Sequence, residues 1–166
     1  MTELPINLSA YAAARVLAGE IGQLRKPTGA LSRVKPNDRL WVREPFALLP
    51  RFDHMAPLQA MFTGDRTVTY LADGVGPGGR RRFARELPKL LHRMHLVVTA
   101  VLTQRLQDVT DDDARLEGAR DRAEFAARWD ELNAPTGQSI SGGKIRWADN
   151  PQMVVITFKR VRGQLS

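Results

Sequence analysis

The stretch MHLVVTAVLTQRL, residues 94–106, is the strongest β-strand signal in the chain. Its many β-branched side chains favour an extended backbone, and its length allows the strand to bend around a small barrel. Shorter β-prone stretches occur at residues 39–44, 67–71 and 153–160. Strands that lie far apart in the sequence, accompanied by a few helices, predict an α+β fold with a small β-barrel as its core and helices packed around it.

Helix signals lie between these strands. Ser9 can cap a helix over residues 10–18, and Thr110 can cap a second helix that ends at Gly118. A third helix is expected at residues 122–133, because apolar residues recur there at positions i, i+4 and i+7 and so form one face. That face should pack against the sheet.

The organisation expected is a single domain over residues 1–166, with mobile, glycine-rich loops at about residues 74–82 and 134–146. The chain has no cysteine, which excludes disulfides, zinc ribbons and thiol nucleophiles. It has no apolar run of the roughly 18 residues that a membrane span needs, and its N-terminus lacks the basic region of a signal peptide. We therefore expect a cytoplasmic protein without a membrane partner.

The charge balance indicates a polyanionic partner. Lysine and arginine number 25 against 18 aspartate and glutamate residues, so the formal net charge is +7. A basic surface attracts nucleic acid mainly through phosphate neutralisation and counterion release. RNA or single-stranded nucleic acid is the expected partner, and a protein partner is the alternative.

One predicted strand carries a candidate contact face. In residues 39–44, apolar side chains alternate with Arg39, Trp41 and Arg43, so an aromatic ring and two guanidinium groups share one face. This grouping suits an unpaired base stacked on the ring, with phosphates on either side. The alternative is that Trp41 belongs to the core and the arginines extend along its edges.

A second basic cluster follows the first glycine-rich loop. It consists of Arg80, Arg81 and Arg82, with Lys89 and Arg93 further along the chain. Basic side chains in or beside a flexible loop can contact a nucleic-acid backbone without sequence preference. The alternative is a solvated loop that only keeps the protein soluble.

Other motifs do not support a cofactor or a metal. Gly74, Gly76 and Gly79 match the dinucleotide pattern G-x-G-x-x-G, but a run of arginines follows them where a helix should begin. His92 and His95 lack a third ligand nearby. We therefore expect neither a cofactor nor a bound metal.

Four blocks occur in a fixed order: GEIGQLRK at residues 19–26, NDRLWVRE at 37–44, QRLQDVTDDDARLEG at 104–118 and NPQMVVITFKRV at 150–161. Together they resemble the ASCH domain, a PUA-like RNA-binding barrel, in the longer form common in phage and prophage genomes. The resemblance implies a small β-barrel, with a cleft between the barrel and the helix that follows the long strand. It also implies a phage or prophage origin.

The family includes both RNA binders and hydrolases. The hydrolases use a lysine and a threonine in the cleft, and the matching positions in this chain are Ile21 and Leu24. Neither side chain can serve as nucleophile, acid or base. Of the cleft residues that the resemblance implies, Arg25 and Glu117 remain, and Lys26 lies next to Arg25 in the sequence.

The function expected is therefore an RNA- or nucleic-acid-binding module that contacts phosphates through a basic surface, and an enzyme is the less favoured interpretation. The candidate contact residues are Arg25, Lys26, Arg39, Trp41, Arg43, Arg80, Arg81, Arg82, Lys89 and Arg93. One alternative is a hydrolase of the ribonuclease or amidohydrolase type, acting on RNA or a modified nucleoside, with Glu117 as its catalytic residue. Another is a phage assembly or host-interaction protein on the same scaffold.

Overall fold

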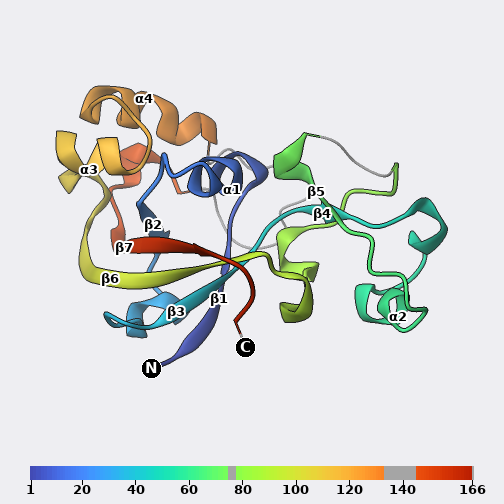
Figure 1. The fold of residues 1–166 in the computed structure, drawn as a ribbon. Coiled ribbons are helices and arrows are strands. Elements are labelled where there is room, and N and C mark those ends of the chain that lie inside the picture. Colours follow the sequence, from blue (N-terminus) through green and yellow to red (C-terminus); the bar gives the residue numbers. More distant parts are fainter. Residues whose placement is uncertain (75–77, 133–144, 166) are drawn as a thin grey trace.

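A five-stranded sheet forms the larger part of the molecule (Figure 1). The computed structural model describes residues 1–74, 78–132 and 145–165. The strand order is β1 (Glu3–Asn7), β3 (Arg39–Arg43), β6 (Met94–Arg105), β7 (Gln152–Arg162) and β2 (Gln23–Pro27). β1 runs parallel to β3, and the other neighbouring pairs are antiparallel.

β6 is the central element of this sheet. It pairs with β3 over its first residues and with β7 along its length, and the pairing with β7 shifts between Val98 and Ala100. Leu96 and Val98 are buried in the main hydrophobic core. The long strand predicted from residues 94–106 is confirmed, and the irregularity gives the strand its bend.

Within the described residues, the sheet does not close into a barrel. β1 and β2 are its two edges, and no ladder joins them in the described part of the chain. Each edge contains a proline, Pro5 in β1 and Pro27 in β2, which cannot donate a backbone hydrogen bond to a further strand. A side-chain contact spans the gap, from Lys26 Nζ to the carbonyl oxygen of Asn7 (2.8 Å). The α+β class is thus confirmed, while the predicted small β-barrel is not, since no closed barrel forms among the described residues.

The predicted helices are confirmed, and they lie on the upper side of the sheet in Figure 1. They are α1 (Ala10–Leu17), α3 (Asp111–Leu116) and α4 (Arg122–Leu132). The hydroxyl of Ser9 accepts a hydrogen bond from the amide of Ala12 (3.1 Å), and Thr110 caps α3 through the amide of Asp113 (3.1 Å). Phe125 of α4 is buried against residues of α3, β7 and the segment after β6, so local capping and burial of one face agree.

A smaller part of the molecule lies beside the main sheet, on the right in Figure 1. Its elements are β4 (Phe46–Ala47), α2 (Pro57–Met61) and β5 (Thr69–Tyr70). It has a hydrophobic core of its own, which includes Phe46, Leu48, Phe52 and Leu87. The strand predicted at residues 67–71 is shorter than expected, because the chain turns into a 3-10 helix at Leu71–Asp73.

Two predicted loops lie partly outside the described residues. The loops expected at about residues 74–82 and 134–146 include residues 75–77 and 134–144, which lie outside the described residues, so their mobility stays a prediction. Among the helices that the structure describes, none has the length and apolar character to cross a bilayer.

Candidate nucleic-acid interface and cleft

The outer face of β3 carries the residues that the sequence predicts for it. Leu40 and Val42 are fully buried, while Arg39, Trp41 and Arg43 are half-buried on the opposite face. This alternation follows from the two-residue repeat of a strand whose inner face packs on the core. The predicted grouping of one ring with two guanidinium groups is therefore present.

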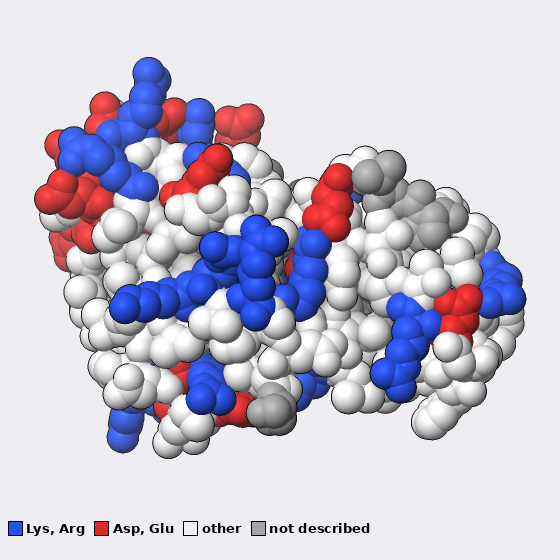
Figure 2. Space-filling view, in the orientation of Figure 1, with Lys and Arg blue, Asp and Glu red and all other residues white. Residues whose placement is uncertain are grey.

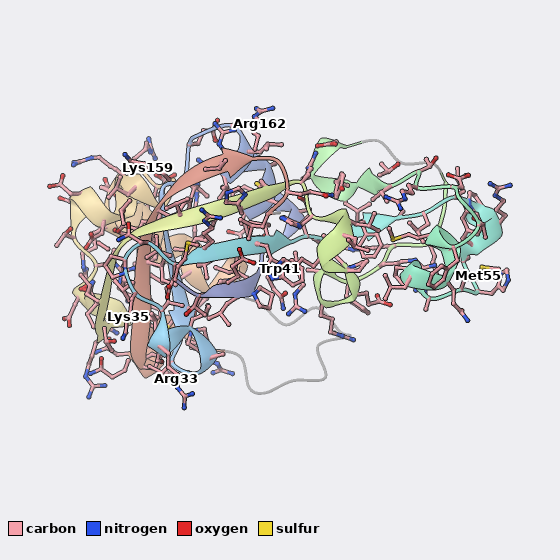
Figure 3. All side chains as sticks on the ribbon, turned by 60° about the horizontal axis from the view of Figure 1, so that its bottom comes forward. Arg33, Lys35, Trp41, Met55, Lys159 and Arg162 are labelled. Carbon is pink, nitrogen blue, oxygen red and sulfur yellow. The ribbon has the colours of Figure 1, made fainter. Side chains whose placement is uncertain are left out.

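Trp41 lies on this face between a cation and a histidine. Its ring centroid is 5.6 Å from the guanidinium carbon of Arg43 and 5.7 Å from the ring of His92. The ring is half-buried. Figure 3 shows Trp41 on β3, with Lys35 and Arg33 on the segment that leads into this strand. The ring is therefore partly exposed, with a guanidinium group and an imidazole beside it.

A groove lies at the open seam between β1 and β2. This seam groove has a volume of about 340 Å³ and is lined by Pro5, Ile6, Asn7, Lys26, Pro27, Thr28, Gly29, Ala30, Leu31 and Arg43. Arg43 donates from Nε to the side-chain oxygen of Asn7 (2.7 Å), and Lys26 donates to the backbone oxygen of the same residue. The seam groove thus contains two of the predicted contact residues.

Arg25 is not available at the surface. Its side chain is fully buried, its Nε lies 2.8 Å from Oε2 of Glu117, and its Nη2 lies 3.4 Å from Oδ2 of Asp113. The amide oxygen of Gln104, in the orientation that satisfies both groups, accepts from Arg25 Nη1 (3.0 Å). Arg25 therefore joins β2 to β6 and α3, and its role here is to position Glu117.

Glu117 lies in a second hollow, which we call the Glu117 cleft. The cleft has a volume of about 230 Å³, and its lining includes Tyr11, Ile21, Gln23, Leu24, Lys26, Glu117 and Phe125. Oε2 of Glu117 accepts from Gln23 and Arg25, both at 2.8 Å, while Oε1 has no hydrogen-bond partner among the described residues. Burial raises the pKa of Glu117 to about 7, against the lowering effect of Arg25.

The second basic cluster is only partly a surface feature. Arg80 and Arg81 are at least partly exposed, and Arg80 is tied to Asp53 through its backbone amide and its Nε. Arg82 is fully buried, and its Nη2 donates to the carbonyl of Phe52 (2.8 Å). The expectation of three adjacent surface arginines is therefore wrong for Arg82, because its backbone pairs with Phe46 and turns the side chain inward.

The remaining predicted contacts are paired with acids. Lys89 lies 2.6 Å from a carboxylate oxygen of Glu3. Arg93 donates to both oxygens of Glu44 (3.0 and 2.8 Å) and also to Asp73. Since these donors are engaged, neither residue is a primary candidate for a phosphate contact.

Sequence reasoning missed several residues of these sites. In the Glu117 cleft, Gln23 donates hydrogen bonds to Asp113 and to Glu117. At the seam groove, the backbone oxygen of Asn7 accepts a hydrogen bond from Lys26. Gln23 could have been found, since it stands two residues before Arg25 in an extended stretch and so shares its face. Asn7 could not, because nothing local in β1 indicates which strand lies beside it.

A further set of basic side chains lies on β7. Lys159 and Arg162 are exposed and Arg160 is half-buried, and Figure 2 shows Lys and Arg gathered at the centre of the face where this strand lies. At the α3 and α4 end of the molecule, basic and acidic side chains are instead mixed. The charge of the protein is thus unevenly distributed.

The described residues contain no group of three or more His, Cys, Asp or Glu side chains that could hold a metal ion. His92 is used structurally: its Nε2 accepts from the amide of Leu165 (2.9 Å), and its Nδ1 contacts the carbonyl of Lys89. His95 Nδ1 lies 3.2 Å from the carbonyl oxygen of Gly163.

Comparison with known proteins identifies no relative, since no family model, no curated protein and no solved structure matches the chain.

Proposed function

We propose that the chain is a nucleic-acid-binding module of the ASCH, PUA-like type, which holds single-stranded RNA or DNA through phosphate contacts and one stacked base. The observation that carries this proposal is the outer face of β3, where Arg39, the half-buried Trp41 and Arg43 follow one another along the strand and the guanidinium of Arg43 lies 5.6 Å from the Trp41 ring centroid. An aromatic plane supplies stacking energy for an unpaired base, and flanking cations neutralise its phosphates.

The surroundings of this face support the same function. In the strand register, Arg39 lies opposite Val97 of β6, which in turn lies opposite the exposed Lys159 of β7. Asn7 lies opposite Arg43, so the seam groove opens beside the same face. A strand of nucleic acid crossing the sheet would therefore meet Arg39 and Lys159 on one side of Trp41 and Arg43 on the other, with Glu3, which lies opposite Arg39, paired to Lys89.

The finer family assignment rests on the ordered sequence blocks. A sheet whose edge strands approach each other through Lys26 and Asn7 is compatible with a PUA-like barrel that is open at one seam. Phage or prophage origin and a cytoplasmic location are proposed on the same resemblance.

The proposal is tested by fluorescence-anisotropy titration of a labelled single-stranded RNA at two salt concentrations. The variant Arg39→Ala/Arg43→Ala should weaken binding, and the slope of log affinity on log salt should fall by about 0.7 for each phosphate that the variant no longer neutralises. Trp41→Leu should weaken binding by about 1–3 kcal/mol without changing the salt slope, because stacking releases no counterions.

The matched control is Arg115→Ala/Arg120→Ala. It removes the same charge from α3 and the segment before α4, where each arginine is exposed and paired with an acid. It should leave affinity and slope nearly unchanged. Equal weakening by the control would mean that the protein binds through net charge alone, and the assignment to β3 would then be wrong.

A hydrolase is the second candidate, favoured by one observation: the pKa of Glu117 is raised to about 7 in a cleft that Lys26 also lines. A carboxyl group that titrates near neutrality is suited to proton transfer. The check is to recover the RNA after titration and to incubate the protein with acetylcytidine. Turnover that disappears in Glu117→Gln would support catalysis, and intact substrates would exclude these two reactions.

A further inference from the structure

We propose that the seam groove is a binding site for the phosphodiester group of a nucleic-acid backbone, held between Lys26 and Arg43. This inference rests on the proposed nucleic-acid binding and names the place where the backbone crosses the sheet edge. Its basis is the convergence of two cations from different strands on one side of a hollow whose described lining contains no acid.

Asn7 brings the two cations together. Its backbone oxygen accepts from Lys26 Nζ of β2, and its side-chain oxygen accepts from Arg43 Nε of β3. Among the described residues, the terminal nitrogens of Arg43 make no hydrogen bond or ion pair, although its guanidinium carbon lies 5.6 Å from the centroid of the Trp41 ring, and Lys26 Nζ makes no ion pair there. Both groups therefore keep N–H donors for a ligand, and the planar fork of an arginine matches two phosphate oxygens.

The lining of the seam groove lacks a counter-charge. No Asp or Glu lines it in the described part of the chain. Two other predicted contact residues, in contrast, have an acidic partner: Arg25 is paired with Glu117 and Arg93 with Glu44. Desolvation lowers the pKa of both Lys26 and Arg43, and a bound anion would offset that cost.

The shape of the groove follows from the open sheet. Pro5 and Pro27 each remove one backbone donor from the edge strands, and no ladder joins these edges in the described part of the chain, so a hollow remains where a closed barrel would have a ladder. Apolar side chains, Ile6 and Leu31, and the hydroxyl of Thr28 complete its walls. The hollow therefore lies at the unpaired edges of the sheet, and the half-buried Lys26 and Arg43 both line it.

The seam groove is continuous with the other candidate sites. Pro5, in its lining, lies opposite Trp41 in the register of β1 and β3. Lys26 lines both the seam groove and the Glu117 cleft. A phosphate at Lys26 and Arg43 would thus place one neighbouring nucleoside towards Trp41 and the other towards the cleft.

The test is NMR of protein labelled with ¹³C at the lysine Cε atoms, which keeps both the positive charge and every N–H donor of the side chain. The chain has few lysines, and Lys26→Arg identifies the signal of Lys26 by difference. The protein is titrated with inorganic phosphate, with uridine, and with the dinucleoside monophosphate UpU, which carries one internal phosphodiester. Phosphate and UpU should shift the Lys26 signal saturably, and uridine should not.

Two variants test whether Arg43 takes part in the binding of UpU. Arg43→Gln removes the arginine fork and should weaken the effect of UpU on Lys26, whereas Arg33→Gln removes an exposed charge outside the groove and should not. If UpU shifts Lys35, Lys89 or Lys159 and leaves Lys26 unmoved, the inference is overturned. A Lys26 response to phosphate but not to UpU overturns the backbone assignment and leaves a free-phosphate site.

The failure of this inference is distinct from failure of the proposed function. If RNA binding depends on Arg39 and Trp41 but UpU does not shift the Lys26 signal, the proposed function stands and the seam groove is not part of the binding site. If the Lys26 signal shifts saturably but the protein does not bind RNA, the seam groove is an anion site and the proposed function is wrong.

Discussion

At the scale of single residues, Glu117 is the group whose ionisation the fold changes most clearly. Its pKa is raised from an ordinary value of 4.5 to about 7 by burial. The folded state therefore holds the proton more tightly than the unfolded chain between these values. The resulting stabilisation is complete below about pH 4.5 and is lost as pH rises to about 7, and it amounts to roughly 3 kcal/mol at most.

Glu117→Gln mimics the protonated acid and should remove this dependence. We expect the free energy of unfolding of the wild type, relative to that of the variant, to fall between about pH 5 and pH 8 in urea denaturation. If the wild type instead loses stability relative to the variant as the solution becomes acidic, attraction between Glu117 and Arg25 outweighs burial, and the carboxylate is ionised throughout.

The sequence indicated correctly which residue types would form the sites, but it did not indicate which of these residues would be exposed. The alternation at residues 39–44 predicted the outer face of β3, because burial of one strand face is a local consequence of sequence. Arg25 and Arg82 could not be placed, since a basic residue is buried or exposed according to partners that arrive from distant segments. For Arg25 those partners are Asp113 and Glu117, which lie far along the chain.

At the scale of elements, caps and β-propensity predicted α1, α3, α4 and β6 closely, since each is determined by its own residues. β1 and α2 were not predicted. β1 contains Pro5, which is unfavourable in a central strand and is tolerated here because β1 is an edge. α2 has five residues, too few for a clear helical repeat.

The beginning of β6 and the C-terminal segment are joined through His92. Nε2 of the ring accepts a hydrogen bond from the amide of Leu165, and Nδ1 contacts the carbonyl oxygen of Lys89. A neutral imidazole with its proton on Nδ1 satisfies both partners. Desolvation lowers the pKa of His92, with smaller effects from Lys89, His95 and Glu3. Since its folded pKa lies below the ordinary value of 6.5, the stability that the neutral ring contributes decreases as pH falls below 6.5.

We expect His92→Gln to reduce the loss of stability between about pH 7.5 and pH 5.5, because a glutamine amide does not titrate. His54→Gln, at an exposed position, is the control and should retain the wild-type difference. The denaturation midpoint at the two pH values measures the effect. A His92 variant with the full wild-type dependence would show that other groups control acid sensitivity.

At the scale of the whole molecule, the closure of the sheet was the feature that sequence could not settle. Strand propensities are alike for an open and a closed sheet, and closure depends on whether the two edges can exchange hydrogen bonds. Pro5 and Pro27 are visible in the sequence, but only the strand order shows that both belong to edges. The seam groove therefore could not be predicted, although Lys26 and Arg43 were predicted as contacts.

The two parts of the molecule are held together by an ionic contact that the sequence also did not indicate. Glu44, after β3, is fully buried and receives two hydrogen bonds from Arg93, which in turn binds Asp73 beyond β5. Removal of Arg93 would leave a buried carboxylate without its partner, which costs about 3–5 kcal/mol. Arg93→Ala should therefore lower the free energy of unfolding by about that amount.

Arg115→Ala is the matched control, because Arg115 and Asp112 form an exposed pair within α3 whose removal should cost about 0–1 kcal/mol. Urea denaturation of both variants, followed by far-UV circular dichroism, gives the comparison. A separate early transition in Arg93→Ala alone would mean that the smaller part unfolds on its own once Glu44 has no cationic partner. Equal and small effects of the two substitutions would contradict the role given to Arg93, and its guanidinium would then count among the accessible cations that can meet a phosphate.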